Sequence, residues 1–306
     1  MHDQTKGALC LSAGLLCYGL GSTILKRFYR LFPDVSSRDI VFFRIFIASL
    51  VFFVITLLLK PSAFKIKPSD LLYFAIFGIA GIFVVQFFLM HSISLISVGT
   101  ATFTQASSSV MLCVYSVAIL KEKLHLNKII GLILGFLGLF LIFYTPNLFK
   151  GSELLGLGLL SALLSAVGKT FYILYGKKGA KRYYTPAMMA YSLLFASMMA
   201  LSLSRPHQVI RAHGATPVFW VYVVTIAMVA SVFALLFYMY GISKLPASNV
   251  AIMNVIEPAA GALTAFVFLG ELLTAQQILA CFFIMLGNIV LNLKINMDKN
   301  IKKELL

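Results

Sequence analysis

Polar and charged residues that interrupt long apolar stretches are the positions at which this sequence could do chemistry. Glu257 lies about halfway along the apolar stretch 247–269 and is followed by Pro258. An ionisable group at that depth in a bilayer usually faces a cavity or a partner, and a proline frees backbone carbonyls that can bind a ligand. We predict that Glu257 binds a substrate, with a neutral Glu bonded to a neighbouring helix as the alternative. Because burial favours the neutral form of a carboxyl group, Glu257 could also exchange a proton.

Two basic residues also fall inside apolar stretches. Lys169 could bind a substrate carboxylate or pair with Glu257, although its long stem could equally reach toward the basic loop that follows. Arg44 lies near the outer end of its stretch, where a substrate contact, an ion pair and an interfacial anchor are all open. We include both residues in the predicted substrate site.

Uncharged side chains in these stretches could complete the site. Gln105 and Asn254 could hydrogen-bond a zwitterion or its waters, and they match each other in the internal repeat described below. Single polar residues of this kind also join membrane helices to one another. Tyr18 and Tyr238 could offer ring faces to a planar or cationic group, or could simply pack. We add these four residues to the predicted site, for which we expect no cofactor and no metal.

The elements that hold these residues are predicted to be membrane helices. The chain has 306 residues, of which 60% are hydrophobic and only 11% charged, and its mean hydropathy is +0.96. Soluble chains carry about 25% charged residues, and a spanning helix needs about 20 apolar residues. The apolar runs are continuous rather than alternating, which favours helices over barrel strands. The ten predicted spans are 7–28, 40–59, 70–90, 98–119, 128–145, 154–175, 185–204, 217–240, 247–269 and 275–294.

The net charge of +15 would suggest nucleic-acid binding in a soluble protein, but the positions of the basic residues indicate membrane topology instead. Lys and Arg concentrate in the N-terminal segment, in the loops after the second, fourth, sixth and eighth spans, and in the C-terminal tail. The group Lys177, Lys178, Lys181 and Arg182 after the sixth span is the strongest marker. Because basic loops stay cytoplasmic, we expect both termini in the cytoplasm and no nucleic-acid partner.

An internal repeat relates the two halves of the chain. Residues 91–142 align with residues 240–291 without a gap. A unit of five spans crosses the membrane an odd number of times, so the second copy is inverted relative to the first. We predict an all-α polytopic membrane protein with ten transmembrane helices in two inverted five-helix repeats, 1–146 and 147–296, and a cytoplasmic tail, 297–306. The matches include Gln105 with Asn254, Glu122 with Glu271, and Gly138 with Gly287.

Two features of the repeat are expected to be structural. Glu122 and Glu271 recur at helix ends on opposite membrane faces, where they could hold turns or gates by accepting backbone hydrogen bonds. Gly131, Gly135 and Gly138 would let a neighbouring helix approach closely.

Several segments of the sequence match the pattern of a known family. They are Arg44-Ile-Phe-Ile-Ala-Ser, the turn Leu120-Lys121-Glu122-Lys123-Leu124, its counterpart Leu269-Gly270-Glu271-Leu272-Leu273-Thr274 followed by Gln277 and Gly287, and the pair Glu257-Pro258. Through these segments essentially the whole chain resembles the drug/metabolite transporter superfamily, and within it the EamA-like transporters of ten helices. The first half departs from the pattern, with Ser108-Ser109 where the second half has Glu257-Pro258 and Lys121 where it has Gly270.

The resemblance and the polar residues together predict a transporter that moves a small organic metabolite by alternating access. A membrane carboxylate, a membrane lysine and several amide and hydroxyl groups suit a small zwitterion, such as an amino acid or S-adenosylmethionine, which some members of the family carry. An exporter of lipophilic or cationic drugs is the alternative. A channel or an intramembrane enzyme fits less well, since no filter sequence, H-E-x-x-H, G-x-S-x-G or phosphate loop is evident.

The expected partners follow from this prediction. They are a small-molecule substrate, the lipid bilayer and either a proton or an exchanged metabolite. We expect the chain to lie in a bacterial inner membrane.

Overall fold

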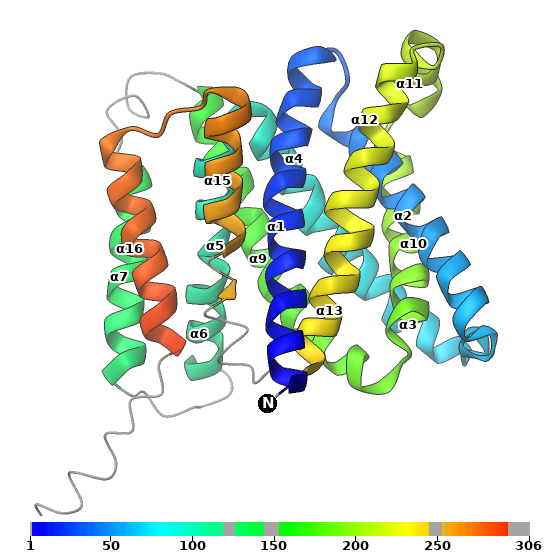
Figure 1. Ribbon diagram of the computed structural model, residues 1–306, viewed down its shortest axis with the longest axis horizontal. Helices are drawn as coiled ribbons and strands as arrows, with labels where there is room; N and C mark the ends of the chain where they lie inside the picture. The colour runs from blue at the N-terminus through cyan, green and yellow to red at the C-terminus, as the bar shows by residue number, and fades with distance from the viewer. Residues whose placement is uncertain (1, 119–125, 144–152, 245–252, 255, 293–306) are drawn as a thin grey trace, which may run out of the picture.

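The computed structural model describes residues 2–118, 126–143, 153–244, 253–254 and 256–292 (Figure 1). Within these residues every regular element is a helix. The α-helices are α1 (His2–Leu31), α2 (Ser37–Leu59), α3 (Pro68–Ile76), α4 (Val84–Leu95), α5 (Val98–Ala106), α6 (Ser108–Ala118), α7 (Leu126–Phe143), α9 (Glu153–Arg182), α10 (Thr185–Leu203), α11 (Pro206–His213), α12 (Pro217–Ala227), α13 (Ala234–Lys244), α15 (Ile256–Leu269) and α16 (Ala275–Asn292). A short 3₁₀ turn, η1 (Pro61–Phe64), follows α2.

Local sequence sets several helix ends. Proline stands in the first turn of α3, α10, α11 and α12, where its missing N–H would have had no intrahelical partner. Ser97 caps α5, because its hydroxyl oxygen accepts a hydrogen bond from the Thr100 backbone N–H at 3.2 Å. Gly270 has φ of +65°, a conformation that glycine adopts freely, and it ends α15.

Two long helical stretches contain a π-helical segment. The segment η2 (Phe77–Phe83) joins α3 to α4, and η3 (Met228–Phe233) joins α12 to α13. A π turn widens the helix and leaves carbonyl oxygens free for other partners, often at functional sites. A Cβ at Gly78 of η2 would lie 2.2 Å from the Ser192 carbonyl oxygen, so glycine permits the close approach of η2 to α10.

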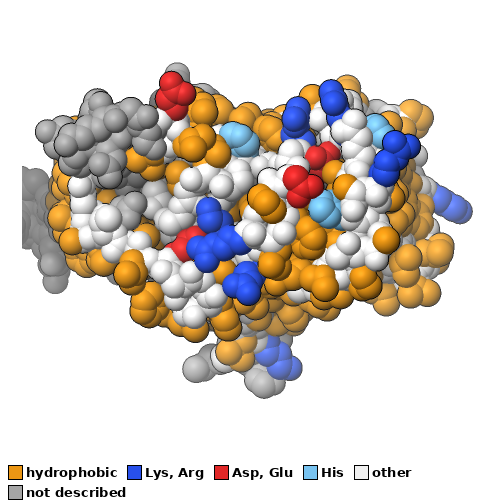
Figure 2. Space-filling model, turned by 90° about the horizontal axis from the view of Figure 1, so that it is seen from above, with side chains coloured by type: hydrophobic (Ala, Val, Ile, Leu, Met, Phe, Trp, Pro, Cys, Tyr) orange, Lys and Arg blue, Asp and Glu red, His pale blue; other side chains and the backbone are white. Residues whose placement is uncertain are grey.

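Among the described residues, six helical stretches are long and apolar enough to cross a membrane. They are Thr5–Leu31, Ser37–Leu59, Pro68–Leu95, Glu153–Gly176, Thr185–Leu203 and Pro217–Gly241. Their outward sides are apolar, as Figure 2 shows around the flanks of the molecule, whereas charged side chains gather on the end face seen in that view. These six stretches confirm an all-helical fold that is suited to a bilayer.

The other four predicted spans lie on shorter or interrupted helices. The span 98–119 is divided between α5 and α6, and the span 247–269 falls partly outside the described residues, with α15 beginning at Ile256. The spans 128–145 and 275–294 coincide closely with α7 and α16. The number of ten membrane crossings therefore stays a prediction.

One predicted loop is helical. The basic segment after the sixth span was expected to leave the membrane as a loop, but α9 continues to Arg182. Because these residues are charged, the last turns of α9 extend beyond its apolar part, which ends at Gly176. Basic residues near a helix C-terminus also complement the helix dipole, which favours this extension.

Glycines bring α7 and α16 into close contact, as the sequence predicts. A Cβ at Gly287 of α16 would lie 2.8 Å from the Gly135 backbone nitrogen and 2.9 Å from the Gly131 carbonyl oxygen. A Cβ at Gly138 would lie 2.7 Å from the Ala280 carbonyl oxygen. Small residues of this kind let membrane helices pack backbone to backbone.

Replacing Gly287 with alanine should therefore destabilise the protein by about 1–3 kcal/mol, the usual range for overpacking. The matched control is Gly261→Ala, whose new Cβ would meet Thr102 Oγ1 at 3.5 Å, an ordinary contact. Thermal unfolding in detergent measures the difference. A Gly287→Ala melting temperature equal to that of the wild type would contradict the close packing of α7 on α16.

Candidate functional site

A cavity between the helices holds most of the predicted substrate site. Its empty space, including the part that opens to solvent, is about 880 Å³. Its walls come from α1, α2, α4, α5, α9, α10, α13 and α15 and from both π-helical segments. The predicted residues that line it are Tyr18, Arg44, Gln105, Lys169, Tyr238 and Glu257.

An ion pair joins α9 to α15 inside the cavity. Lys169 Nζ lies 2.9 Å from Glu257 Oε2, and the two side chains are only 20% and 12% exposed. Glu257 lies in the first turn of α15, where the positive end of the helix dipole favours a carboxylate. Of the roles that the sequence left open for Lys169, the structure shows the pairing with Glu257 rather than a stem reaching to the basic segment.

Gln105 is a second hydrogen-bond partner of the lysine. Lys169 Nζ donates to Gln105 Oε1 at 3.3 Å, and Gln105 Nε2 donates to Ser165 Oγ at 2.7 Å. Ser165 Oγ in turn donates to the Val85 carbonyl oxygen at 2.8 Å. This chain of hydrogen bonds fixes the amide of Gln105, so its carbonyl oxygen faces the ammonium group.

Arg44 is buried in the cavity wall, which rules out the interfacial anchor considered from the sequence. The residue is only 5% exposed. Nε donates to Ser231 Oγ at 2.8 Å and Nη2 to the Ala230 carbonyl oxygen at 2.5 Å. Both partners belong to the π-helical segment η3, and both are uncharged. Within the described residues, Arg44 has no salt bridge, so it contributes an unpaired positive charge to the cavity.

Tyrosine rings form part of the same wall. Tyr18 and Tyr238 meet edge to face, with ring centroids 6.2 Å apart. Tyr172, which lines the cavity beside them, stacks on Phe77 of η2 at 5.1 Å. The Tyr172 hydroxyl is buried and has no hydrogen-bond partner among the described residues. The cavity therefore combines three charged groups with aromatic faces.

Asn254 is the predicted site residue that does not line the cavity. Its side chain instead interacts with that of Tyr238, and its Oδ1 is buried with no partner in the described part of the chain. The repeat placed Asn254 at the same depth as Gln105. Depth alone did not fix which way the side chain points.

The sequence reasoning missed the serines that orient these groups. Ser165 orients Gln105, Ser231 binds Arg44, and Ser22 contributes to the cavity wall. A single serine in an apolar helix usually serves helix packing. No signal in the sequence separates these three serines from the many others in apolar stretches.

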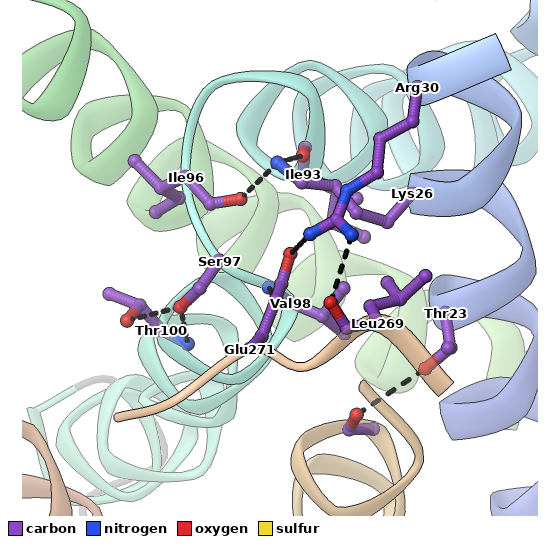
Figure 3. Close-up of polar contacts among 11 residues, drawn as sticks. Thr23, Lys26, Arg30, Ile93, Ile96, Ser97, Val98, Thr100, Leu269 and Glu271 are labelled. Carbon is purple, nitrogen blue, oxygen red and sulfur yellow. Dashed lines mark hydrogen bonds and ion pairs between the residues drawn. The ribbon is translucent and has the colours of Figure 1, made fainter. Parts of the chain in front are cut away.

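A second group of charged residues lies where α1 ends, and none of its members lines the cavity (Figure 3). Lys26 Nζ donates to the carbonyl oxygens of Ile93 at 2.7 Å and Ile96 at 2.8 Å. These carbonyls end α4 and lack intrahelical partners, so a cation there satisfies them and the helix dipole together. Lys26 thus fastens the end of α1 to the end of α4.

Glu271 ties three helices together at the same end of the molecule (Figure 3). Its Oε1 lies 3.3 Å from Arg30 Nη2, and its Oε2 accepts a hydrogen bond from the Val98 backbone N–H at 2.9 Å. Arg30 Nη1 also donates to the Leu269 carbonyl oxygen at 2.9 Å. The expectation that Glu271 accepts a backbone hydrogen bond is confirmed. Its counterpart Glu122 lies outside the described residues.

The end of α9 is tied to α3 at the other end of the molecule. Arg182 Nη2 lies 2.9 Å from Asp70 Oδ1, and the Tyr183 hydroxyl donates to the same oxygen at 2.7 Å. The Tyr73 hydroxyl donates to the Tyr175 carbonyl oxygen at 2.5 Å. Polar ties therefore lie at both ends of the helices that surround the cavity.

Six long apolar helical stretches in the described part of the chain, with a buried, charged cavity between helices, define a polytopic membrane protein. The sequence profile of the EamA-like transporter family matches residues 5–144 and again residues 156–293, so the chain belongs to this family of the drug/metabolite transporter superfamily. It is an integral membrane protein of the transporter class.

Relatives of the chain share this class. An uncharacterised transporter of Archaeoglobus fulgidus is 25% identical over 279 residues, which span 91% of this chain and 96% of the relative. An uncharacterised transporter of Clostridium kluyveri is 23% identical over 240 residues, spanning 76% and 75%. A protein of known crystal structure has the same fold, with a TM-score of 0.58 at 19% identity over 91% of this chain and 96% of its own.

Proposed function

We propose that this transporter moves a small organic zwitterion, an amino acid or a related compound such as S-adenosylmethionine, by alternating access. The observation that supports this most is the joint presence of Glu257, Lys169 and Arg44 in one cavity. The site has a carboxylate for an ammonium group and cations for a carboxylate. Both ends of a zwitterion could therefore be bound at once.

The geometry supports a defined orientation of such a substrate. Arg44 uses Nε and Nη2 for the η3 segment, and its Nη1 has no partner among the described residues. A guanidinium group binds carboxylates well because its donors are planar and fixed. The substrate carboxylate would bind Arg44, and its ammonium group would bind Glu257 beside the Tyr18 and Tyr238 rings, which attract cations.

Inverted repeats would supply the alternating access. We propose ten crossings in two halves, residues 1–146 and 147–296, followed by the tail 297–306. The family profile matches the chain twice, which supports a duplication. The packing is also reciprocal, since α1 packs on α13 and α15 while α9 packs on their counterparts α4 and α6.

Opposite directions of α1 and α9 support the inversion. Ile96 accepts a hydrogen bond from Lys26 near the end of α1, and it also contacts Gly158 near the start of α9. The end of α1 and the start of α9 therefore lie at the same end of the molecule (Figure 1). The basic last turns of α9 lie at the end where α1 begins, and we propose that this end is cytoplasmic in a bacterial inner membrane.

On this topology, Arg30 and Glu271 lie at the outer face and would help to close it. They join α1 of the first half to the segment after α15 of the second. A movement of one half against the other would have to break this tie. The Arg30 side chain is 44% exposed, so water can replace its partner when the tie breaks.

A cationic drug is the alternative substrate, because Glu257 and the tyrosine rings alone would suit a cation. Arg44, whose partners are uncharged, opposes this alternative through charge repulsion. Uptake measured with both zwitterions and organic cations distinguishes the two substrates.

The first experiment measures uptake and binding by the purified protein in proteoliposomes, with L-amino acids, S-adenosylmethionine, nucleosides and organic cations, with and without a pH gradient. We expect saturable uptake of a zwitterion and a loss of about tenfold or more in affinity for Glu257→Gln, because a buried charge partner is removed. The matched control Glu153→Gln, at the exposed start of α9, should behave as the wild type. Uptake confined to organic cations, or undiminished in Glu257→Gln, would contradict the proposed substrate or site.

Glu271→Gln should loosen the outer closure, because it removes the charge that Arg30 binds while leaving an acceptor for Val98. A cysteine placed at Ser22 in the cavity wall, in a background without the four natural cysteines, reports whether the cavity is open to the outside. We expect a membrane-impermeant maleimide, added outside intact cells, to label this cysteine several-fold more in the Glu271→Gln variant. Asp34→Asn, which removes the carboxylate that is hydrogen-bonded to His213 Nε2, is the control. Unchanged labelling in both Glu271→Gln and Arg30→Gln would refute the outer closure.

A further inference from the structure

Glu257 already has a cationic partner in the empty cavity. Lys169 Nζ lies 2.9 Å from Glu257 Oε2, the place where the proposed substrate would put its ammonium group. The lysine also has a second acceptor, Gln105 Oε1, at 3.3 Å. Lys169 is thus held between two oxygen atoms, of which one is charged and one is neutral.

Three further ionisable groups face Glu257 from the neighbouring helices. Tyr18 on α1, Arg44 on α2 and Tyr238 on α13 all interact electrostatically with Glu257. The tyrosines are neutral groups, and Arg44 is hydrogen-bonded to the η3 segment. Apart from Lys169, the first turn of α15 also favours a carboxylate, through its helix dipole. Lys169 is the cation in direct contact.

A transporter that binds a cationic group on a buried carboxylate has to neutralise that carboxylate when the substrate leaves. A bare buried charge is costly, so a proton, a dissolved ion or a side chain must take the place of the substrate. Lys169 is a side chain already in that place. Its long flexible stem lets the ammonium group move by a few ångströms without moving the helix.

We propose that Lys169 is a tethered counter-ion, which keeps Glu257 ionised in the empty transporter and gives way to the ammonium group of the substrate. When displaced, Lys169 stays bound to Gln105 Oε1, which Ser165 holds in position. The empty transporter can then change conformation without a proton on Glu257. This inference rests on the proposed function, and its test uses no substrate.

The test measures how readily Glu257 reacts with dicyclohexylcarbodiimide, a hydrophobic reagent that modifies protonated carboxyl groups in apolar surroundings. The purified full-length protein in detergent is labelled between pH 6 and pH 8, and the peptide that contains Glu257 is quantified by mass spectrometry. We expect little labelling of the wild type across this range. In Lys169→Met we expect labelling several-fold higher at pH 6 and falling as the pH rises, because a carboxyl group without its cation binds a proton more readily.

Two further variants keep the test decisive. Glu257→Gln in the Lys169→Met background should lose the added label, which assigns it to Glu257. Lys169→Gln replaces Lys169→Met if the latter does not elute as a single species, since its amide tolerates a polar cavity better. Equal labelling of Glu257 in the wild type and in the lysine variants would overturn the proposal, because Glu257 would then stay ionised without Lys169. That result would not contradict the proposed transport of a zwitterion, which is tested separately by the uptake experiment.

Discussion

The structure depends on the cost of placing a charge among apolar helices. Each charged side chain in the cavity has a polar partner: Glu257 pairs with Lys169, and Arg44 donates to a hydroxyl and a carbonyl oxygen of η3. These contacts connect distant segments, since they hold α9 to α15 and α2 to η3. Because an unpartnered buried charge is unstable, the same contacts that would bind a substrate also hold the helices around the cavity.

Irregular places in the helices supply several of these polar contacts. In η3 the Ala230 carbonyl oxygen accepts a hydrogen bond from Arg44, and π-helical segments of this kind often lie at functional sites. Likewise α6 begins at Ser108 and α15 at Ile256, close to matching positions of the repeat, so each half presents a helix start near the cavity. In the second half that start carries Glu257. Pro258, which looked like a break in the middle of a span, stands in the first turn of α15, where proline is tolerated.

The sequence predicted the charged part of the site because charge in an apolar stretch is rare and must be explained. Glu257, Lys169 and Arg44 could be found in this way, and pairing with Glu257 was one of the roles that the sequence left open for Lys169. Asn254 does not line the cavity but interacts with Tyr238, which does, because a repeat matches depth and not direction. Ser165 and Ser231 could not be found, because a hydroxyl is stable in many places in a helix bundle. The helical end of α9 was missed because charged residues were read as a loop, although they extend a helix equally well beyond the bilayer.

The two kinds of ion pair differ in what it takes to break them. Arg30 and Glu271 lie where water can reach the arginine, and pairs of this kind contribute about 1 kcal/mol or less, so thermal motion can open them. Lys169 and Glu257 are largely shielded, and removal of one partner from a buried pair costs about 3–5 kcal/mol. Separating a shielded pair into bare charges is therefore costly, whereas replacing one cation by another keeps the carboxylate paired. Alternating access as proposed needs an end face that opens and a centre that exchanges its ligand, and the different exposure of the two pairs is consistent with these two roles.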